Sequence, residues 1–449
     1  MTKYSLRSSA LDILLRVGDN GAFSHLLIDQ ALKSNKIAVR DQALLTEMVY
    51  GTLQRKLSLD YFVNHFVAKP NKLKSWVRWL LYLSFYQMHY LSKVPDHAII
   101  HEAVSIANER GHKGISSLVN GVLRSAQRQG FPSFEAISDD VERISLATSH
   151  PAWLVDRWIK QYGLEKTEVI CQANLDSKPL SVRVQPLRIT KEQAIDQLQE
   201  EGYQTAQSSF SPQGLIVEEG NILKSELFQK DCLTIQDQSS MLVAEMMQIE
   251  ENQYVLDACS APGGKTTHIA EKLNNTGQVM AYDLHEKKVD LVAVKAFALG
   301  LSNIETKGAD SRELSAFHEP NSFDRILIDA PCSGLGVIRG KPDIKYNKDE
   351  ADIMKLAKIQ LELLENISPL LKKDGKLLYS TCTVDKEENE RVIEAFLQAH
   401  PDFEIDQTFF TELPDVLKQA PGITTTGLQI FPDDYQTDGF FLTRIQKKG

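Results

Sequence analysis

Apolar side chains recur three or four positions apart along roughly the first 130 residues, with glycines and prolines between the runs. This spacing gathers them on one face of an α-helix, so the pattern predicts an all-helical N-terminal region. The most apolar stretch, residues 77–91, contains Arg78, Gln87 and His89 and is short for a membrane span, so we expect a buried helix there. The runs are Leu11, Leu14, Leu15 and Ala22; Leu44, Leu45, Met48 and Val49; Trp76, Trp79, Leu80, Leu83 and Tyr86; and Val119, Val122 and Leu123.

A smaller α/β pattern follows a segment rich in Pro, Ser, Gly and acidic residues at 130–140, which predicts a linker. Pro151 opens a predicted helix. Residues 180–185 alternate apolar and polar side chains and predict a strand, on which we expect Arg183 to be solvated or to face RNA. Thr190 and Gln193 predict a capped helix start, and residues 215–217 and 232–235 predict short strands.

After Gln236 the pattern alternates between strands and helices to the end of the chain. Apolar strands are predicted at residues 254–257, 279–282, 325–328 and 376–380, which is typical of a parallel sheet with helices on both faces. The predicted fold class is therefore multidomain. It comprises an all-α domain at 1–135, a small α+β domain at 145–230 and an α/β domain at 231–449.

Composition favours a cytosolic protein. The chain has 449 residues, 42% of them hydrophobic, and five cysteines, an odd number that does not indicate a secreted disulfide framework. Residues 1–15 lack the apolar core of a signal peptide. We therefore expect a cytoplasmic location, no membrane association and reduced thiols.

Charge is distributed unevenly along the chain. Residues 1–130 hold 17 Lys and Arg against 9 Asp and Glu, a net of +8, and the remainder carries −18 of the total of −10. A basic N-terminal region joined to an acidic body suggests nucleic-acid binding, although a solvated basic surface explains the charge equally well. The same two interpretations apply to Lys69, Lys72, Lys74 and Arg78, which either contact phosphates or line an exposed helix face.

A glycine-containing loop links the strand at 254–257 to a helix. Such a turn lets a ligand approach the N–H groups at a helix start. A Walker A loop would need glycine where Cys259 stands, and the dinucleotide fingerprint Gly-x-Gly-x-x-Gly is missing. A tight turn without a ligand is the remaining alternative. The candidate cofactor-binding residues of this loop are Cys259, Ser260, Ala261, Pro262, Gly263, Gly264 and Lys265.

Carboxylates follow three further predicted strands. Asp283 ends the second strand, at the distance from the loop where an acid can hold ribose hydroxyls. Asp310 is expected at the end of a third strand, near an adenine ring, and Asp329 ends a fourth. Because open α/β sheets bind ligands at the carboxyl ends of their strands, the three acids together with the loop predict a cofactor site.

Two cysteines, Cys332 and Cys382, follow predicted strands and should lie on the same sheet edge as the acids. Cys171 and Cys232 are interpreted as small buried hydrophobic residues. No CxxC pair or histidine cluster predicts a metal site. A thiolate beside a methyl donor has a specific use, because addition to carbon 6 of cytosine makes carbon 5 nucleophilic. The base must be unstacked to reach the thiol, and Asp329 can hydrogen-bond its amine or N3.

Five blocks of the chain together resemble the RNA 5-methylcytosine methyltransferases. The N-terminal region is similar to the NusB-like RNA-binding fold at Arg40-Asp41, Tyr50-Gly51 and residues 119–124. This combination resembles the bacterial small-subunit (16S) ribosomal RNA cytosine-C5 methyltransferases. The blocks are residues 236–240, 257–266, 329–334, 380–383 and 438–441.

The resemblance implies a Rossmann-like class I methyltransferase domain that binds S-adenosyl-L-methionine. It implies that Cys382 is the nucleophile, that Cys332 assists proton removal or product release, and that Asp329 is catalytic. The loop 259–265, Asp283, Asp310 and Asp329 would hold the cofactor, and Lys265 would fix the site or simply cap the helix. Ribosomal RNA is the implied partner, with no obligate protein partner. The chain departs from the family at Gln185, where Asn is usual, and at residues 433–435, where relatives often carry His.

Other functions compete with this hypothesis. A transfer-RNA substrate would require identical chemistry. A non-catalytic RNA-binding assembly factor would not need both thiols. A DNA cytosine methyltransferase would use the Pro-Cys thiol alone, and a protein amide methyltransferase typically has an Asn-Pro-Pro-Tyr-type loop where this chain has residues 329–332.

Overall fold

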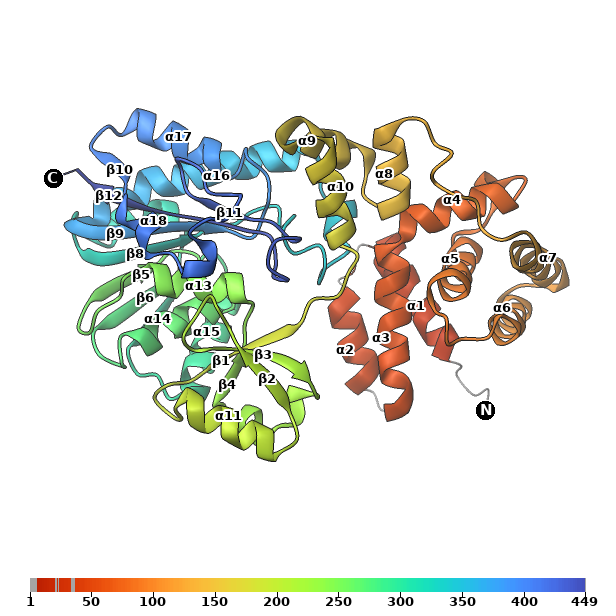
Figure 1. Ribbon diagram of the computed structural model, residues 1–449, viewed down its shortest axis with the longest axis horizontal. Helices are drawn as coiled ribbons and strands as arrows, with labels where there is room; N and C mark the ends of the chain where they lie inside the picture. The colour runs from red at the N-terminus through yellow and green to blue at the C-terminus, as the bar shows by residue number, and fades with distance from the viewer. Residues whose placement is uncertain (1–5, 21, 23, 34–36, 449) are drawn as a thin grey trace. The chain divides into compact units, whose positions relative to one another are not determined.

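The computed structural model describes residues 6–20, 22, 24–33 and 37–448 (Figure 1). The chain forms two compact units. The helical unit comprises residues 1–175 and 340–348, and the sheet unit comprises residues 176–339 and 349–449. The three domain boundaries expected from the sequence remain predictions. Part of the segment expected to lack a signal peptide, residues 1–5, lies outside the described residues.

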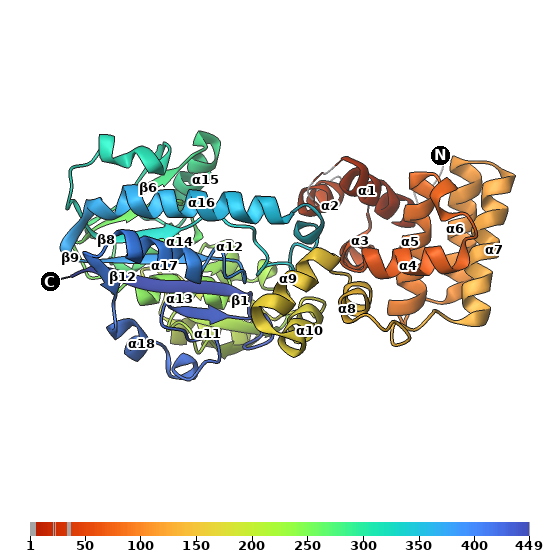
Figure 2. The same cartoon turned by 90° about the horizontal axis from the view of Figure 1, so that it is seen from above.

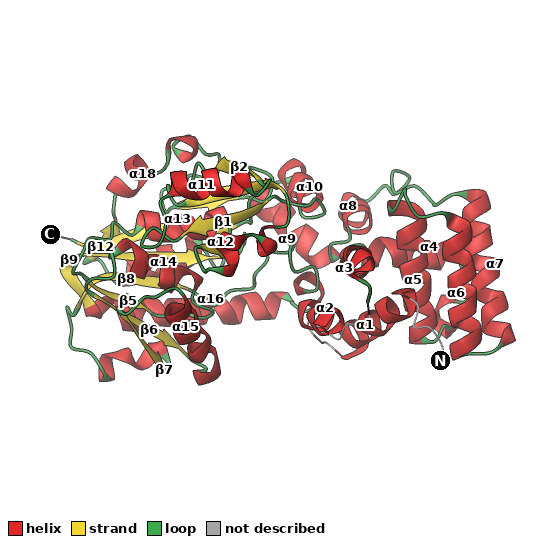
Figure 3. Ribbon diagram, turned by 90° about the horizontal axis from the view of Figure 1, so that it is seen from below, coloured by secondary structure: helices red, strands yellow, loops and turns green. Residues whose placement is uncertain are grey.

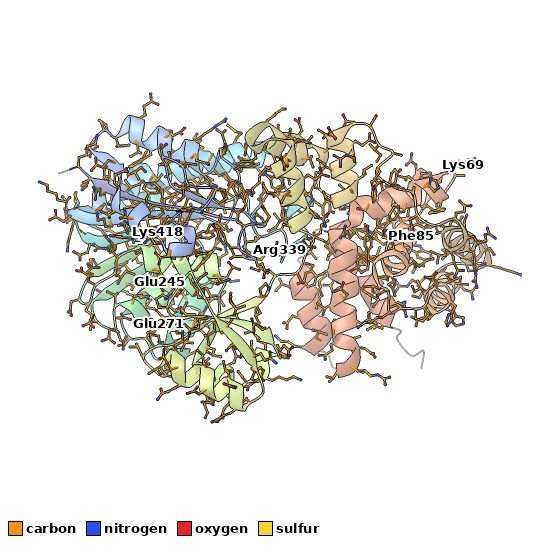
Figure 4. All side chains as sticks on the ribbon, viewed as in Figure 1. Lys69, Phe85, Glu245, Glu271, Arg339 and Lys418 are labelled. Atoms are coloured by element: carbon orange, nitrogen blue, oxygen red, sulfur yellow. The ribbon has the colours of Figure 1, made fainter. Side chains whose placement is uncertain are left out.

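The helical unit confirms the predicted all-α N-terminal region. Its apolar core surrounds α5, whose Leu80, Leu83 and Phe85 are fully buried, and Figure 4 labels Phe85 among the packed side chains. No helix among the described residues is long and apolar enough to span a membrane. The helices are α1 (Leu6–Asn20), α2 (Ser24–Lys33), α3 (Val39–Gln54), α4 (Lys56–Phe66), α5 (Ser75–Tyr90), α6 (Asp96–Arg110), α7 (Lys113–Gln129), α8 (Asp140–Thr148), α9 (Ala152–Tyr162) and α10 (Leu164–Ala173).

Residues 340–348 follow residue 339 of the sheet unit in sequence but pack inside the helical unit. They contain the 3-10 helix η4 (Ile344–Tyr346). Lys345 is fully buried, and its Nζ donates to the Gln54 carbonyl oxygen at 2.9 Å. The Tyr346 hydroxyl donates to the Ser149 carbonyl at 3.0 Å. The placement of residues 340–348 in the helical unit was not predicted, because nothing in their local sequence pattern marks a change of unit.

A small antiparallel sheet begins the sheet unit, with the strand order β2-β3-β1-β4. It confirms the predicted α+β segment, including the capping box of Thr190 and Gln193 at the start of α11. The side chain of Gln185 is buried and donates to the Leu299 carbonyl. The elements are β1 (Leu180–Val184), α11 (Lys191–Glu200), β2 (Gln204–Gln207), β3 (Gly214–Glu219), α12 (Glu226–Gln229) and β4 (Leu233–Ile235).

The prediction for Arg183 was wrong, because this side chain neither faces solvent nor is available to RNA. It is completely buried and forms a bidentate ion pair with Glu271, at 2.7 Å through Nε and 2.8 Å through Nη2. Its other N–H groups donate to Gln236, to the Gly264 carbonyl and to Thr267. Figure 4 labels Glu271 together with Glu245, a second acid of the sheet unit. Alternation along one strand predicts only which face a residue lies on, and here another element covers that face.

The large sheet has the order β10-β12-β9-β8-β5-β6-β7, with β11 paired to β12. Strands β5 to β9 are parallel, as predicted, but β12 runs antiparallel to β9, β10 and β11. The sheet is therefore mixed rather than purely parallel. The strands are β5 (Tyr254–Asp257), β6 (Gln278–Asp283), β7 (Ile304–Gly308), β8 (Phe323–Asp329), β9 (Leu371–Thr381), β10 (Phe403–Ile405), β11 (Leu428–Ile430) and β12 (Phe440–Lys447).

Helices cover both faces of this sheet (Figures 2 and 3). Consecutive strand residues such as Val255 and Leu256 belong to two different core clusters, one on each face. One cluster includes residues of α13, α14 and α15, and the other includes residues of α16 and α17. The helices are α13 (Gln238–Met246), α14 (Gly264–Lys272), α15 (Glu286–Ala298), α16 (Glu350–Ile367), α17 (Glu390–Ala399) and α18 (Thr408–Glu412).

Candidate active site

The loop between β5 and α14 has the geometry of a ligand-binding turn. Gly263 has a φ of 93°, a conformation that favours glycine, and α14 begins at the next residue. A Cβ on Gly264 would meet only Lys295 Nζ, at 3.8 Å, so there is open space beside the helix start. The hydroxyl of Ser260 is buried and has no hydrogen-bond partner among the described residues. Open space beside a helix start and an unpaired hydroxyl suit a polar ligand.

Asp257, the last residue of β5, links this loop to the helix that follows it. Its carboxylate accepts a hydrogen bond from Thr266 Oγ1 at 2.7 Å, which ties the end of β5 to the first turn of α14. Burial raises the pKa of Asp257 to about 7. Asp257 was not predicted to be a site residue, although it is the first residue of the block at 257–266 that resembles the family.

The acids after the strands are arranged largely as predicted. Asp283 ends β6, and its Oδ2 accepts the Ala261 N–H at 3.4 Å, so it lies beside the loop. Asp329 ends β8. Asp310 differs, because β7 ends at Gly308 and Asp310 caps the following 3-10 helix. A hydrogen bond from Arg312 lowers the pKa of Asp310.

Lys265 forms an ion pair across the site instead of merely capping its helix. Its Nζ lies 2.7 Å from Asp329 Oδ2, while Ser380 donates to the other oxygen at 2.8 Å. Burial alone would lower the pKa of Lys265, but Asp329 and the neighbouring Cys382 raise it, and the net shift is upward. The ammonium also lies 5.2 Å from the centre of the Phe440 ring.

The two cysteines selected from the sequence lie together, with 3.4 Å between Cys332 Sγ and Cys382 Sγ. The hydrogen bond to Cys382, burial and nearby charges, including that of Glu388, raise the pKa of the Cys332 thiol well above its usual value. Burial and the surrounding carboxylates raise that of Cys259. Cys171 is fully buried, as expected, whereas Cys232 is only half-buried.

A cavity of about 280 Å³ opens between these elements. It is lined by the loop residues 259–262, Gly264 and Lys265, and by Asp329 and Cys382. Cys332, Asp283, Asp310 and Gly263 are not among its lining residues. Further lining residues were not selected from the sequence as site residues. They come from the start of α13, from α15 and from the start of β12, and include Gln236, Asp237, Lys295, Asp438 and Phe440.

The described residues contain no group of three or more His, Cys, Asp or Glu side chains that could hold a metal ion.

The strand order, the loop after β5 and the adjoining carboxylates define a Rossmann-like methyltransferase. Family models match the chain as 16S rRNA methyltransferase RsmB/F over residues 244–446, as the NusB family over 5–128, and as the ferredoxin-like domain of RsmF/B over 150–222. The chain is 48% identical to probable ribosomal RNA small subunit methyltransferase B of Bacillus subtilis, with 100% of both chains covered. It is 34% identical to ribosomal RNA small subunit methyltransferase B of Proteus mirabilis, also with 100% of both covered. The chain therefore belongs to the 16S rRNA methyltransferase RsmB/F family.

Solved structures support the same fold. The crystal structure of PH0851 matches with a TM-score of 0.81 at 24% identity and covers 100% of this chain and 99% of its own. A methyltransferase homolog from Pyrococcus horikoshii matches with a TM-score of 0.59 at 27% identity, covering 70% of this chain and 100% of its own. The family and the three-part fold expected from the sequence are thus confirmed.

Proposed function

We propose that this methyltransferase transfers the methyl group of S-adenosyl-L-methionine to carbon 5 of a cytosine in 16S rRNA, with Cys382 as covalent nucleophile. The observation that carries the proposal is the pair of thiols 3.4 Å apart at the carboxyl ends of β8 and β9, one of which lines the cavity with Lys265 and Asp329. Methylation of an oxygen or an exocyclic nitrogen needs no such thiol.

The residues present fit the cofactor. The loop 259–265 offers open space at Gly264 and the unpaired Ser260 hydroxyl, while Asp283 beside the loop is suited to ribose hydroxyls. The cofactor supplies an electrophilic methyl group to the cavity. Asp310 is the weaker member of the predicted set, because Arg312 already occupies its carboxylate.

The thiol chemistry follows from the charges around Cys382. Lys265 and Cys382 attract each other when both are charged, so the ammonium favours the thiolate. The thiolate adds to carbon 6, and Asp329 accepts a hydrogen bond from the amine of the base. Carbon 5 then takes the methyl group, which leaves S-adenosyl-L-homocysteine. Carbon 5 next loses its proton to a base, and the bond between carbon 6 and Cys382 Sγ breaks to release the methylated cytosine.

Cys332 is suited to a later step. The hydrogen bond to Cys382 is the largest of the effects that raise the pKa of Cys332, and the charge of Cys382 is another. Once Cys382 is bonded to carbon 6, both effects disappear and Cys332 ionises more readily. We therefore assign Cys332 to proton removal or release of the product.

The helical unit is proposed to hold the RNA. Lys69, Lys72 and Lys74 are exposed, in keeping with a phosphate-contacting strip, but Arg78 is engaged with Asp60 and with the Pro70 carbonyl. The relatives are small-subunit ribosomal RNA methyltransferases, which supports ribosomal RNA over transfer RNA and a cytoplasmic place of action.

The test compares the wild type with Cys332→Ala and Cys382→Ala. Each protein is incubated with S-adenosyl-L-methionine and unmodified 16S rRNA and run on a denaturing gel. We expect Cys332→Ala to accumulate a covalent protein–RNA band that Cys382→Ala cannot form. A band from Cys382→Ala alone would reverse the two roles. If no variant forms an adduct and the wild type methylates only transfer RNA, the substrate assignment is wrong.

A further inference from the structure

Two consecutive residues that the mechanism does not use, Glu388 and Asn389, lie directly before α17 and are completely buried. Buried polar side chains are retained at a cost unless each polar atom is satisfied, so their partners indicate what they hold in place. These partners are the chain segments on either side of the two thiols.

Glu388 binds the segment that carries Cys332. Its Oε2 accepts the Ser333 N–H at 2.8 Å and its Oε1 accepts the Ser333 hydroxyl. Gln360 Nε2 donates both to Glu388, at 3.1 Å, and to the Pro331 carbonyl, at 2.9 Å. The residue after Cys332 is therefore bonded to this carboxylate directly, and the residue before it is linked to the carboxylate through Gln360.

Asn389 binds the segment that carries Cys382. Its Oδ1 accepts the Thr381 hydroxyl at 2.6 Å, and its Nδ2 donates to the Thr383 carbonyl at 3.2 Å. A second bond from Nδ2 to Gln429 Oε1, at 2.8 Å, anchors the amide. The residues before and after Cys382 are thus held by one amide. Thr383 and Ser333 are also joined, through their hydroxyls, at 2.8 Å.

We propose that Glu388 and Asn389 are positioning residues, one for each thiol, and that the buried Glu388 carboxylate, bound to the residue next to Cys332, repels a second negative charge there, so that Cys382 is the thiol that reacts with RNA. The part concerning RNA rests on the proposed function. Neither residue is expected to contact substrate, because neither lines the cavity.

The electrostatic part has a specific pH signature. Burial raises the pKa of Glu388 to about 7, so this carboxyl is charged above that pH and neutral below it. Its negative charge raises the pKa of Cys332, after the larger effects of Cys382 and burial. The titratable groups that interact with Glu388 include Asp385, Tyr379 and Cys332. The effect of Glu388 on Cys332 should therefore appear only above about pH 7.

The experiment measures alkylation of the full-length protein by iodoacetamide without RNA, with separate rates for Cys332 and Cys382 from peptide mass spectrometry. In Glu388→Gln we expect Cys332 to react about threefold or more faster than in the wild type near pH 8.5, and at the same rate near pH 6. Glu390→Gln is the matched control, because Glu390 is the next buried glutamate and has no hydrogen bond to either thiol segment among the described residues. It should leave both rates unchanged.

A rate ratio for Glu388→Gln that does not change with pH, or the same change in Glu390→Gln, would overturn the electrostatic part. Asn389→Ala tests the other residue and should alter the rate at Cys382 more than that at Cys332. If both variants change both thiols equally, separate positioning is wrong. Should Glu388→Gln fail to fold, Ser333→Ala removes one bond that holds the Cys332 segment and should change the alkylation rate of Cys332 more than that of Cys382. Since no RNA or methyl donor is used, these outcomes are independent of the proposed methylation reaction.

Discussion

Replacing Arg183 by Met should destabilise the sheet unit strongly. All five N–H donors of this guanidinium find acceptors, including the two oxygens of Glu271 and the Gly264 carbonyl at the start of α14. Both members of the ion pair are completely buried. Methionine fills a similar volume but leaves Glu271 buried with the Gln213 amide, at 3.0 Å, as its only remaining hydrogen-bond partner among the described residues.

The magnitude follows from the burial. Removing one partner of a buried ion pair typically costs about 3–5 kcal/mol, because the remaining charge is uncompensated. For a unit of this size, about 1 kcal/mol corresponds to about 2–4 °C in Tm, so we expect Tm to fall by about 6–20 °C. Replacing both partners by Met should cost less than the sum of the two single variants, since no unpaired charge is left.

Thermal unfolding followed by far-UV circular dichroism checks this prediction. Tryptophan fluorescence is unsuitable for it, because all four tryptophans, at positions 76, 79, 153 and 158, lie in the helical unit. Arg188→Met is the matched control. Arg188 is an exposed arginine five residues away that donates to two backbone carbonyls, and its loss should cost at most about 1 kcal/mol. A Tm for Arg183→Met equal to that of Arg188→Met, or strict additivity with Glu271→Met, would refute the reasoning.

Three further predictions concern other buried groups. Because burial raises the pKa of Asp257 to about 7, the folded state binds more protons than the unfolded state between about pH 4 and 7. The sheet unit should therefore lose stability as pH rises through this range. Asp257→Asn should show less of this loss when unfolding is followed by circular dichroism. Burial lowers the pKa of Lys345 instead, so the folded state binds fewer protons than the unfolded state and the helical unit should gain stability as pH rises toward the ordinary lysine pKa of about 10. Tryptophan fluorescence of Lys345→Met should show a smaller gain. A Cβ on Gly336 would lie 2.0 Å from the Gly439 carbonyl oxygen and 2.8 Å from that of Cys382. Gly336→Ala should therefore lower the methyl-transfer rate, measured with radiolabelled cofactor, about tenfold or more. An unchanged rate would contradict the tight approach of these segments.

The sequence by itself predicted the helices and strands that have a regular local pattern of apolar residues. Helical spacing predicted the helices of the N-terminal region, and apolar runs predicted β5, β6, β8 and β9 with small boundary errors. Since parallel strands share one carboxyl edge, the positions of Asp283, Asp329, Cys332 and Cys382 after such runs were enough to predict that they lie along the same edge of the sheet. The family resemblance extended this to the whole chain and is confirmed.

Tertiary structure decided which groups face one another. Strand β12 is antiparallel to β9, with Phe441 opposite Thr381, so its beginning rather than its end lies beside Cys382. This is why Asp438 and Phe440 line the cavity, a result that a prediction of a purely parallel sheet could not give.

Burial was the other property that only packing between distant segments could determine. Arg183 has Glu271, 88 positions later, as its partner, and Lys345 is buried beside Gln54, 291 positions earlier. Glu388 and Asn389 hold the thiol segments through residues that lie six to 55 positions away. A local sequence pattern predicts that a charged side chain is solvated. Its burial is stable only when another part of the chain supplies a partner.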